Sequence, residues 1–299
     1  MGTTARVTVV GEASPLLADA ALRRIHELES RWSRFLPTSE LSRVNQSGGA
    51  PCLVSADTFE LIERLIQAWH ETAGRFDPTV HDALVALGYV DRLPTTFTLD
   101  PAASDASSPR GCDDIRLDRS CGMVWLPSGV RLDPGGLGKG LAADIVAREA
   151  MAAGASGVLI DLGGDLRAIG TSPDGGAWRI SVEHPCDPDV AIAMIETTNG
   201  GVATSSRQKR RWTVSDGATD RLVHHVIDPR TSAPAQTSWL TATVLAPDAA
   251  SAEVGATVAF LDGAPAGAPH VFAALLADEH GCGPVTGPHP ELILCAVPT

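Results

Sequence analysis

Apolar and polar positions along the chain repeat with two different periods. Apolar residues recur three or four positions apart in four segments, which predicts helices over 18–35, 55–74, 142–154 and 249–263. The second of these opens with a serine or aspartate that can cap its first turn, and it closes on a glycine. A glycine also closes the third helix.

Apolar runs without helical spacing predict strands. The run at 122–133 is interpreted as two strands around a Pro-Ser-Gly turn, and 156–170 as a buried strand that enters a glycine turn. Further strand-like runs lie at 6–10, 178–185, 191–206, 224–231, 239–248 and 291–298.

Helices and strands are both plentiful, but they do not alternate strictly, which favours an α+β fold over a doubly wound sheet. Two stretches interrupt the pattern. Residues 37–45 break the helical spacing, and 94–112 is rich in Pro, Ser, Ala and Asp, which predicts an exposed excursion outside the core. No repeat or clean linker is visible. The interpretation is a single domain over 1–299, with two lobes as the alternative.

Composition and charge exclude several classes of protein. The chain has 299 residues, 44% hydrophobic and 20% charged, which is typical of a globular protein. A net charge of −13 argues against nonspecific nucleic-acid binding. The sequence contains neither a secretory h-region nor a run long enough for a membrane span. Its six cysteines form no CxxC pair, which indicates reduced structural thiols.

A glycine-rich segment, LDPGGLGKGLAADIV at 132–146, precedes the third helix. It matches neither the P-loop pattern nor the GxGxxG dinucleotide pattern. Glycines alone are equally consistent with a tight turn that packs a helix closely on a strand. Lys139 among bare backbone N–H groups instead favours a bound phosphate.

Other polar clusters each have a functional and a structural interpretation. The Asp-Pro-Thr at 77–79 is typical of a helix N-cap. The segment HHVIDPRTSAP at 224–234 offers acid/base or metal-binding histidines, or an ordinary turn. The basic run SRQKRRW at 206–212 can contact phosphate or simply be a solvated strand. Glu253 and Thr257 lie four apart on one helix face, either as Mg²⁺ ligands or as an exposed polar pair.

In this order the segments resemble the ApbE family, the FAD:protein FMN transferases. Seven collinear stretches carry the resemblance and cover nearly the whole chain, and the start, MGTTARVTV, is similar as well. The stretches are RFLPTSELSRVN, GRFDPTV, LDPGGLGKGLAADIV, LIDLGGDLRAIG, GVATSS, HHVIDPRTSAP and VLAPDAASAEVGATVAF.

The resemblance implies an ApbE-like α+β fold, with mixed and antiparallel sheets flanked by helices in two closely packed lobes. It implies that FAD binds at the glycine-rich segment with Mg²⁺ at its pyrophosphate. The main-chain carbonyl of Gly136 and the side chains of Glu253 and Thr257 would surround the metal, and His225 would be the general base. The flavin nucleotide would contact Met1, Phe35, Asp77, Pro78, Thr79, Asp133, Lys139 and Ile227.

The implied reaction is phosphoryl transfer, in which a Thr or Ser hydroxyl of an acceptor protein attacks the FMN phosphorus of FAD and AMP leaves. Two alternatives stay open: a protein that binds FAD without turnover, and an FAD pyrophosphatase that gives FMN and AMP with water.

This sequence departs from the family pattern at several positions. Glu253 stands where the family has a metal-binding Asp, and Leu141, Ser206 and Ser232 replace an aromatic residue and two glycines. The leader and lipid-attachment cysteine of exported members are also missing, which predicts a cytoplasmic protein with a cytoplasmic acceptor. A precursor whose leader has been removed is the alternative.

Overall fold

A computed structural model describes residues 3–90, 94–99, 111–265, 268, 270–287 and 292–294. The chain divides into two compact units, and each is described by itself. Unit 1 comprises Met1–Leu28, Gly136–Ser205 and Thr237–Thr299, and unit 2 comprises Glu29–Gly135 and Ser206–Gln236. Helices and sheets occur in both units, so the α+β prediction is confirmed.

Unit 1 is built on a seven-stranded sheet in the order β1-β6-β7-β10-β15-β16-β17. Strands β6 and β7 form an antiparallel hairpin, which β1 and β10 extend as antiparallel neighbours. The strands are β1 (Ala5–Val10), β6 (Gly157–Leu162), β7 (Leu166–Gly170), β10 (Asn199–Ser206), β15 (Thr241–Ala246), β16 (Ala273–Asp278) and β17 (Gly281–Thr286).

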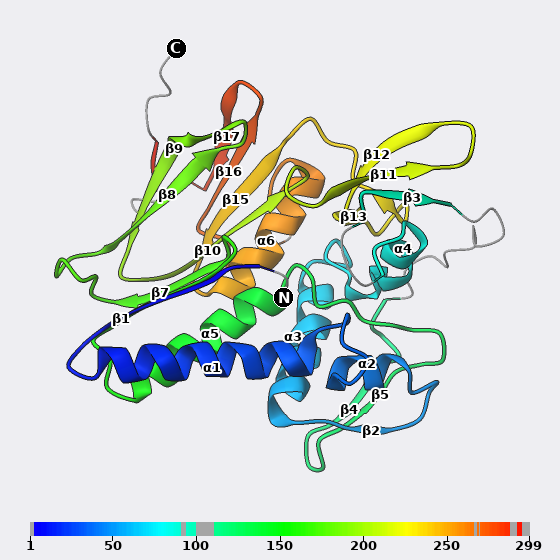
Figure 1. The fold of residues 1–299 in the computed structure, drawn as a ribbon, viewed down its shortest axis with the longest axis horizontal. Helices are drawn as coiled ribbons and strands as arrows, with labels where there is room; N and C mark the ends of the chain where they lie inside the picture. Colours follow the sequence, from blue (N-terminus) through cyan, green and yellow to red (C-terminus); the bar gives the residue numbers. More distant parts are fainter. Residues whose placement is uncertain are drawn as a thin grey trace. The chain divides into compact units, whose positions relative to one another are not determined.

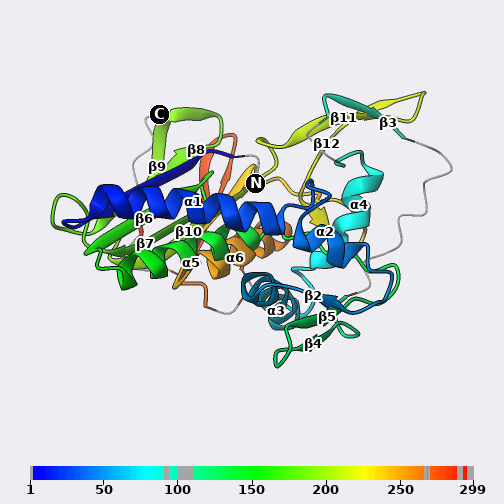
Figure 2. The same ribbon diagram turned by 60° about the horizontal axis from the view of Figure 1, so that its bottom comes forward.

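Both faces of this sheet are covered around the inner strand β15, because every residue in that strand is buried. Val244 faces Gly255 of helix α6 (Ala249–Asp262), which packs beside α5 (Gly138–Ala152) (Figure 1; Figure 2). Neighbouring side chains on a strand point to opposite faces. Leu245 accordingly joins the core formed with a second sheet of β8 (Trp178–His184), β9 (Asp187–Thr197) and β18 (Leu292–Leu294).

Helices α5 and α6 approach closely because Gly140, which lies at their contact, has no side chain. A Cβ on Gly140 would lie 2.4 Å from the carbonyl oxygen of Ala249. Asp144 of α5 also accepts the N–H groups of Ala249 and Ala250, at 2.9 and 3.0 Å, and so caps α6 from a neighbouring helix. The position of α6 relative to α5 is therefore fixed by hydrogen bonds as well as by packing.

Unit 2 combines helices with small sheets. Its core joins helix α4 (His81–Ala86) to a mixed sheet in the order β12-β11-β3, with Trp212 fully buried between them. The other elements are α2 (Glu40–Asn45), α3 (Ala56–Glu71), η1 (Pro78–Val80), β2 (Cys52–Leu53), β3 (Thr96–Thr98), β4 (Arg116–Asp118), β5 (Met123–Trp125), β11 (Arg211–Ser215), β12 (Asp220–His224), β13 (Ile227–Asp228) and β14 (Ala233–Pro234). Helix α1 (Ser14–Trp32) begins in unit 1 and ends in unit 2.

The structure corrects several of the predicted elements. The stretch 37–45, interpreted as a break, contains helix α2, which Ser39 caps through the N–H of Ser42. Only Met123–Trp125 of the predicted strand pair at 122–133 is a strand, and it pairs with β2 and β4. Helix α5 begins at Gly138, four residues before the predicted start, so Lys139 lies in its first turn rather than in a loop.

The predicted excursion at 94–112 contains a strand, because Thr96–Thr98 pairs in parallel with β11. Residues 100–110 of that excursion lie outside the described residues. Of the predicted final strand at 291–298, Leu292–Leu294 is observed, and the rest lies outside the described residues. Within the described part of the chain no helix is long and apolar enough to cross a membrane. The thiols of Cys52, Cys112 and Cys121 are free.

Candidate functional site

A cluster of one lysine and two carboxylates lies in unit 1. Lys139 Nζ donates to both Asp165 and Glu253, and the N–H of Gly140 donates to the second oxygen of Glu253 at 2.8 Å. The three charged side chains are largely buried, with exposed fractions of 19%, 7% and 5% for lysine, aspartate and glutamate. They come from the first turn of α5, the β6–β7 turn and α6. The glycine-rich segment thus presents its lysine to two carboxylates.

Burial and charge act against each other in this cluster. Burial alone would lower the pKa of Lys139, but the charges of Asp165 and Glu253 hold it above its ordinary value. Burial and the charge of Glu253 raise the pKa of Asp165, which the ammonium of Lys139 opposes. The lysine is therefore charged at neutral pH and is the counter-ion of both carboxylates.

The residues predicted as metal ligands lie next to this cluster. Thr257 Oγ1 donates to the main-chain oxygen of Glu253 at 3.1 Å and lies 3.5 Å from Ser205 Oγ. Gly136 lies two residues before α5 with a φ of +91°, a conformation that glycine adopts readily. Among the described residues no three His, Cys, Asp or Glu side chains form a preformed metal cage.

The donor chemistry nevertheless fits a hard divalent cation. Carboxylate, hydroxyl and carbonyl oxygens are the ligands that Mg²⁺ prefers, and it commonly binds one or two carboxylates together with substrate phosphates. Two carboxylates here already converge on a cationic group, the ammonium of Lys139. Asp165 and Glu253 thus lie where a positive charge is stabilised.

A second group of predicted residues lies in unit 2. Asp77 caps η1, accepting the N–H of Thr79 at 2.8 Å and its hydroxyl at 2.7 Å, with Pro78 in the first helical position. The capping interpretation of this segment is therefore confirmed. The N–H of Asp133 donates to the carbonyl of Pro78 at 2.8 Å, which ties the Asp-Pro-Thr segment to the first residues of the glycine-rich segment within unit 2.

Arg34 links this group to an aromatic cluster. Its Nε lies 2.6 Å from Asp133 Oδ2, and both side chains are buried. Its guanidinium carbon also lies 4.2 Å from the ring centre of Phe35 and 4.7 Å from that of Tyr89, within cation–π range. Ile227 belongs to the same apolar core, against which Phe35 packs. Six of the residues predicted to contact a flavin nucleotide, namely Phe35, Asp77, Pro78, Thr79, Asp133 and Ile227, thus form one connected group.

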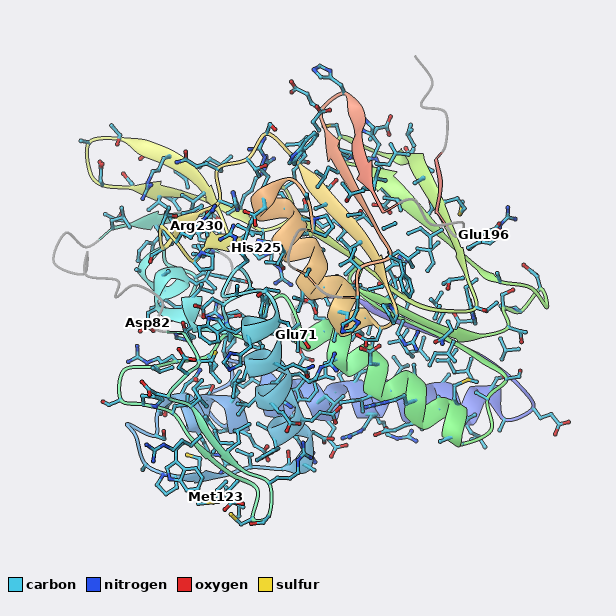
Figure 3. The ribbon with its side chains drawn as sticks, turned by 180° about the vertical axis from the view of Figure 1, so that it is seen from behind. Glu71, Asp82, Met123, Glu196, His225 and Arg230 are labelled. Carbon is cyan, nitrogen blue, oxygen red and sulfur yellow. The ribbon has the colours of Figure 1, made fainter. Side chains whose placement is uncertain are left out.

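The predicted base, His225, directly follows β12 (Figure 3). Its N–H donates to the carbonyl oxygen of Arg210 at 3.3 Å, and its ring Nδ1 lies 3.4 Å from the same oxygen. Because a carbonyl only accepts, this contact requires the proton on Nδ1. A neutral ring of that tautomer carries its lone pair on Nε2, which is the property a general base needs.

The neighbouring His224 has a structural role that makes stability depend on pH. It is buried, its Nδ1 accepts the N–H of Val226 at 3.3 Å and its Nε2 lies 3.1 Å from the carbonyl of Ala235. Burial lowers the pKa of His224. Histidine in the unfolded chain has a pKa of about 6.5. Below that pH the unfolded chain therefore binds a proton at His224 more readily than the folded chain does.

We expect the free energy of unfolding to fall as the pH drops below about 6.5, and His224→Gln to remove part of that slope. Denaturant melts of both proteins between pH 5 and 8 would measure it. His280→Gln, at an exposed position, serves as the control and should keep the wild-type slope. An unchanged slope in His224→Gln would contradict this role.

The structure also identifies residues that the sequence did not single out. Asp165 completes the lysine cluster, Arg34 pairs with Asp133, and Asp144 caps α6. The GGD of the β6–β7 turn was the available signal for Asp165, because two glycines that allow a tight turn place a charged residue at the end of a buried strand. Asp228, which lies in the segment interpreted as acid/base or metal-binding histidines or as an ordinary turn, pairs with Arg75 and Arg230. Met1 lies outside the described residues.

Comparison with known proteins gives a consistent set of relatives. The model of the ApbE family matches residues 1–275. A FAD:protein FMN transferase of Salmonella typhimurium is 29% identical over 261 residues, which cover 85% of this chain and 74% of that protein. The corresponding protein of Treponema pallidum is 27% identical over 286 residues, which cover 88% of this chain and 77% of that protein.

Solved structures with a similar fold also come from ApbE proteins. The crystal structure of an ApbE protein from Thermotoga maritima superposes with a TM-score of 0.81 at 26% identity, covering 95% of this chain and 93% of that one. The flavin transferase ApbE from Vibrio cholerae gives a TM-score of 0.77 at 24% identity over the same shares, a likeness of fold. The predicted fold is therefore confirmed.

Proposed function

The chain belongs to the ApbE family, and on that basis we propose that it is a Mg²⁺-dependent FAD:protein FMN transferase. It would attach FMN through a phosphoester to a Thr or Ser of an acceptor protein and release AMP. Curated relatives that carry the transferase name support the activity. The observation in this chain that supports it best is the buried cluster of Lys139, Asp165 and Glu253.

This cluster offers the charges that pyrophosphate chemistry needs. Glu253, Thr257 and the carbonyl of Gly136 would hold Mg²⁺, and Asp165 adds a second carboxylate nearby. Bound there, Mg²⁺ would neutralise the negative charge that develops on the pyrophosphate oxygens. Lys139 would contribute a positive charge to the same phosphates. Glu and Asp are both oxygen donors, so the replacement of the family's aspartate by Glu253 keeps the donor type.

Residues of unit 2 would bind the flavin nucleotide. Phe35 and Ile227 offer apolar contact, while the Asp-Pro-Thr segment and Asp133 offer hydrogen-bonding groups held rigidly by one another. Met1 is proposed as a further contact from the resemblance alone. Rigid support of this kind reduces the entropy that binding costs.

His225 would serve as the general base. Its Nε2 would take the proton of the acceptor hydroxyl as the hydroxyl oxygen forms a bond to the FMN phosphorus and the bond to the AMP oxygen breaks. Its Nδ1–H would keep donating to the carbonyl oxygen of Arg210, which orients the ring. Water in place of the acceptor would give FMN and AMP, the pyrophosphatase alternative. The cytoplasmic location of enzyme and acceptor stays a prediction.

The fate of FAD tests this function. We expect incubation of the protein with FAD and Mg²⁺ to release AMP, and EDTA to stop the release, because the phosphoryl group needs charge neutralisation. Chromatography of AMP, FMN and FAD measures it, and flavin fluorescence of an acceptor protein after denaturing electrophoresis detects covalent transfer. Equal amounts of FMN and AMP without labelled acceptor would indicate a pyrophosphatase. Bound, intact FAD under both conditions would indicate a flavin-binding protein and overturn the proposal.

A further inference from the structure

Lys139 already pairs with Glu253, the carboxylate that a metal ion would need as a ligand. Both oxygens of Glu253 are engaged, one by Lys139 Nζ and the other by the N–H of Gly140. Asp165 shares the same ammonium. The two buried carboxylates are thus held together by one internal cation.

A divalent cation on Glu253 would lie next to this ammonium. Two cations on one buried carboxylate repel strongly, because the surroundings screen charge poorly. The metal ion and the Lys139 ammonium therefore each weaken the binding of the other to Glu253. Metal binding to Glu253 and the contact between Lys139 and Glu253 are therefore in competition.

The identity of the cation also matters. The chain has 23 lysines and arginines, of which only Lys139 and Lys209 are lysines. An arginine would hold two carboxylates with a rigid, planar fork of donors. A lysine carries a compact charge on a flexible four-carbon stem and binds phosphate as a point charge. Lysine is thus suited to exchange its carboxylate partners for phosphate oxygens.

We propose that Lys139 makes metal binding depend on FAD. In the FAD-free protein its ammonium pairs with Asp165 and Glu253. When FAD binds, the lysine side chain moves its ammonium to the pyrophosphate oxygens. The carboxylates are then available to Mg²⁺. The binding order is nucleotide first and metal second. This inference rests on FAD being the substrate, but its central claim, that Lys139 excludes a divalent cation from the FAD-free protein, can be tested without FAD.

The test measures Mn²⁺ binding to the nucleotide-free protein, using the electron paramagnetic resonance signal of free Mn²⁺. We expect Lys139→Gln, which removes the charge but keeps hydrogen-bond donors, to bind one Mn²⁺ at least about tenfold more tightly than wild type. Lys139→Arg keeps the charge and should bind Mn²⁺ as weakly as wild type. The double variant Lys139→Gln, Glu253→Gln should lose the gain.

Lys209→Gln is the matched control, because it removes the same charge at an exposed position. It should leave Mn²⁺ binding unchanged. If Lys139→Gln fails to fold without metal, circular dichroism with and without Mn²⁺ provides the readout, and folding restored by Mn²⁺ supports the proposal. Equal Mn²⁺ affinity in wild type and Lys139→Gln, or no folding of Lys139→Gln with Mn²⁺, overturns it. Mg²⁺-dependent AMP release alongside equal affinities would leave the transferase function intact and remove only the binding order.

Discussion

Glu253→Ala is expected to lower the rate of AMP release from FAD by about 100-fold or more. Even residues that only orient a metal ligand typically contribute 10–100-fold to affinity or activity, and Glu253 is proposed as a ligand itself. The substitution also removes one of the two carboxylates around Lys139 and the acceptor of the Gly140 N–H. AMP formation at saturating FAD and Mg²⁺ measures the loss.

Two further variants make the result specific. Glu196 lies on β9 and pairs with Arg179 at the surface, so Glu196→Ala should keep the wild-type rate (Figure 3). Glu253→Asp retains the carboxylate in the form that the family uses and should keep much more activity than Glu253→Ala. Near-wild-type AMP release by a folded Glu253→Ala protein would show that the metal lies elsewhere.

Gly140→Ala is expected to destabilise unit 1 by about 3 kcal/mol, at the upper end of what overpacking costs. The added Cβ would meet main-chain atoms of Ala249 at 2.4 and 2.5 Å, so a side-chain rotation cannot relieve the clash. Helices α5 and α6 would have to separate, which weakens the hydrogen bonds that the N–H groups of Ala249 and Ala250 donate to Asp144. We expect the melting temperature to fall by roughly 6–12 °C.

Thermal melts followed by circular dichroism measure this change. Gly176→Ala is the matched control in unit 1, because Gly176 has ordinary backbone angles and open space around its Cβ position. It should stay within about 0.5 kcal/mol of wild type. An unchanged melting temperature in Gly140→Ala would mean that α5 and α6 are not in close contact at this residue.

The sequence predicted elements well where their hydrophobic period extends over several turns. Helices α1, α3 and α6 were found, and Ser55 caps α3, as its start signal indicates. Short elements escaped detection for a physical reason. Helix α2 spans only six residues, fewer than two full turns, so its stability depends on Ser39 and on tertiary packing rather than on a periodic pattern.

Strand pairing was harder to predict than strand position. Residues 123–125 form a strand, as expected, but the chain does not fold back on itself at the Pro-Ser-Gly turn. Its partners are β2 and β4, and β2 lies about 70 residues earlier in the sequence. A local turn signal carries no information about such distant partners, because strand pairing depends on which surfaces meet in the folded core.

The candidate site was predictable only from the resemblance. Spacing placed Glu253 and Thr257 on one face of a helix, but it gave no reason to bring Lys139 to them from 114 residues away. That contact depends on Gly140 and Asp144, which dock α5 on α6. The partner of Asp133 was likewise not evident, because Arg34 precedes it by about 100 residues.

Each unit is formed by separate segments of the chain, and this determines which unit is fully synthesised first. Unit 2 has all its residues once position 236 leaves the ribosome, whereas unit 1 needs Thr237–Thr299 as well. Until then, β10 lacks its neighbour β15, and Asp144 on α5 lacks the N–H group of Ala249, which lies 105 residues later in the chain. The nascent protein therefore carries a half-built sheet with an open edge, a surface that invites pairing with other chains and that chaperones recognise.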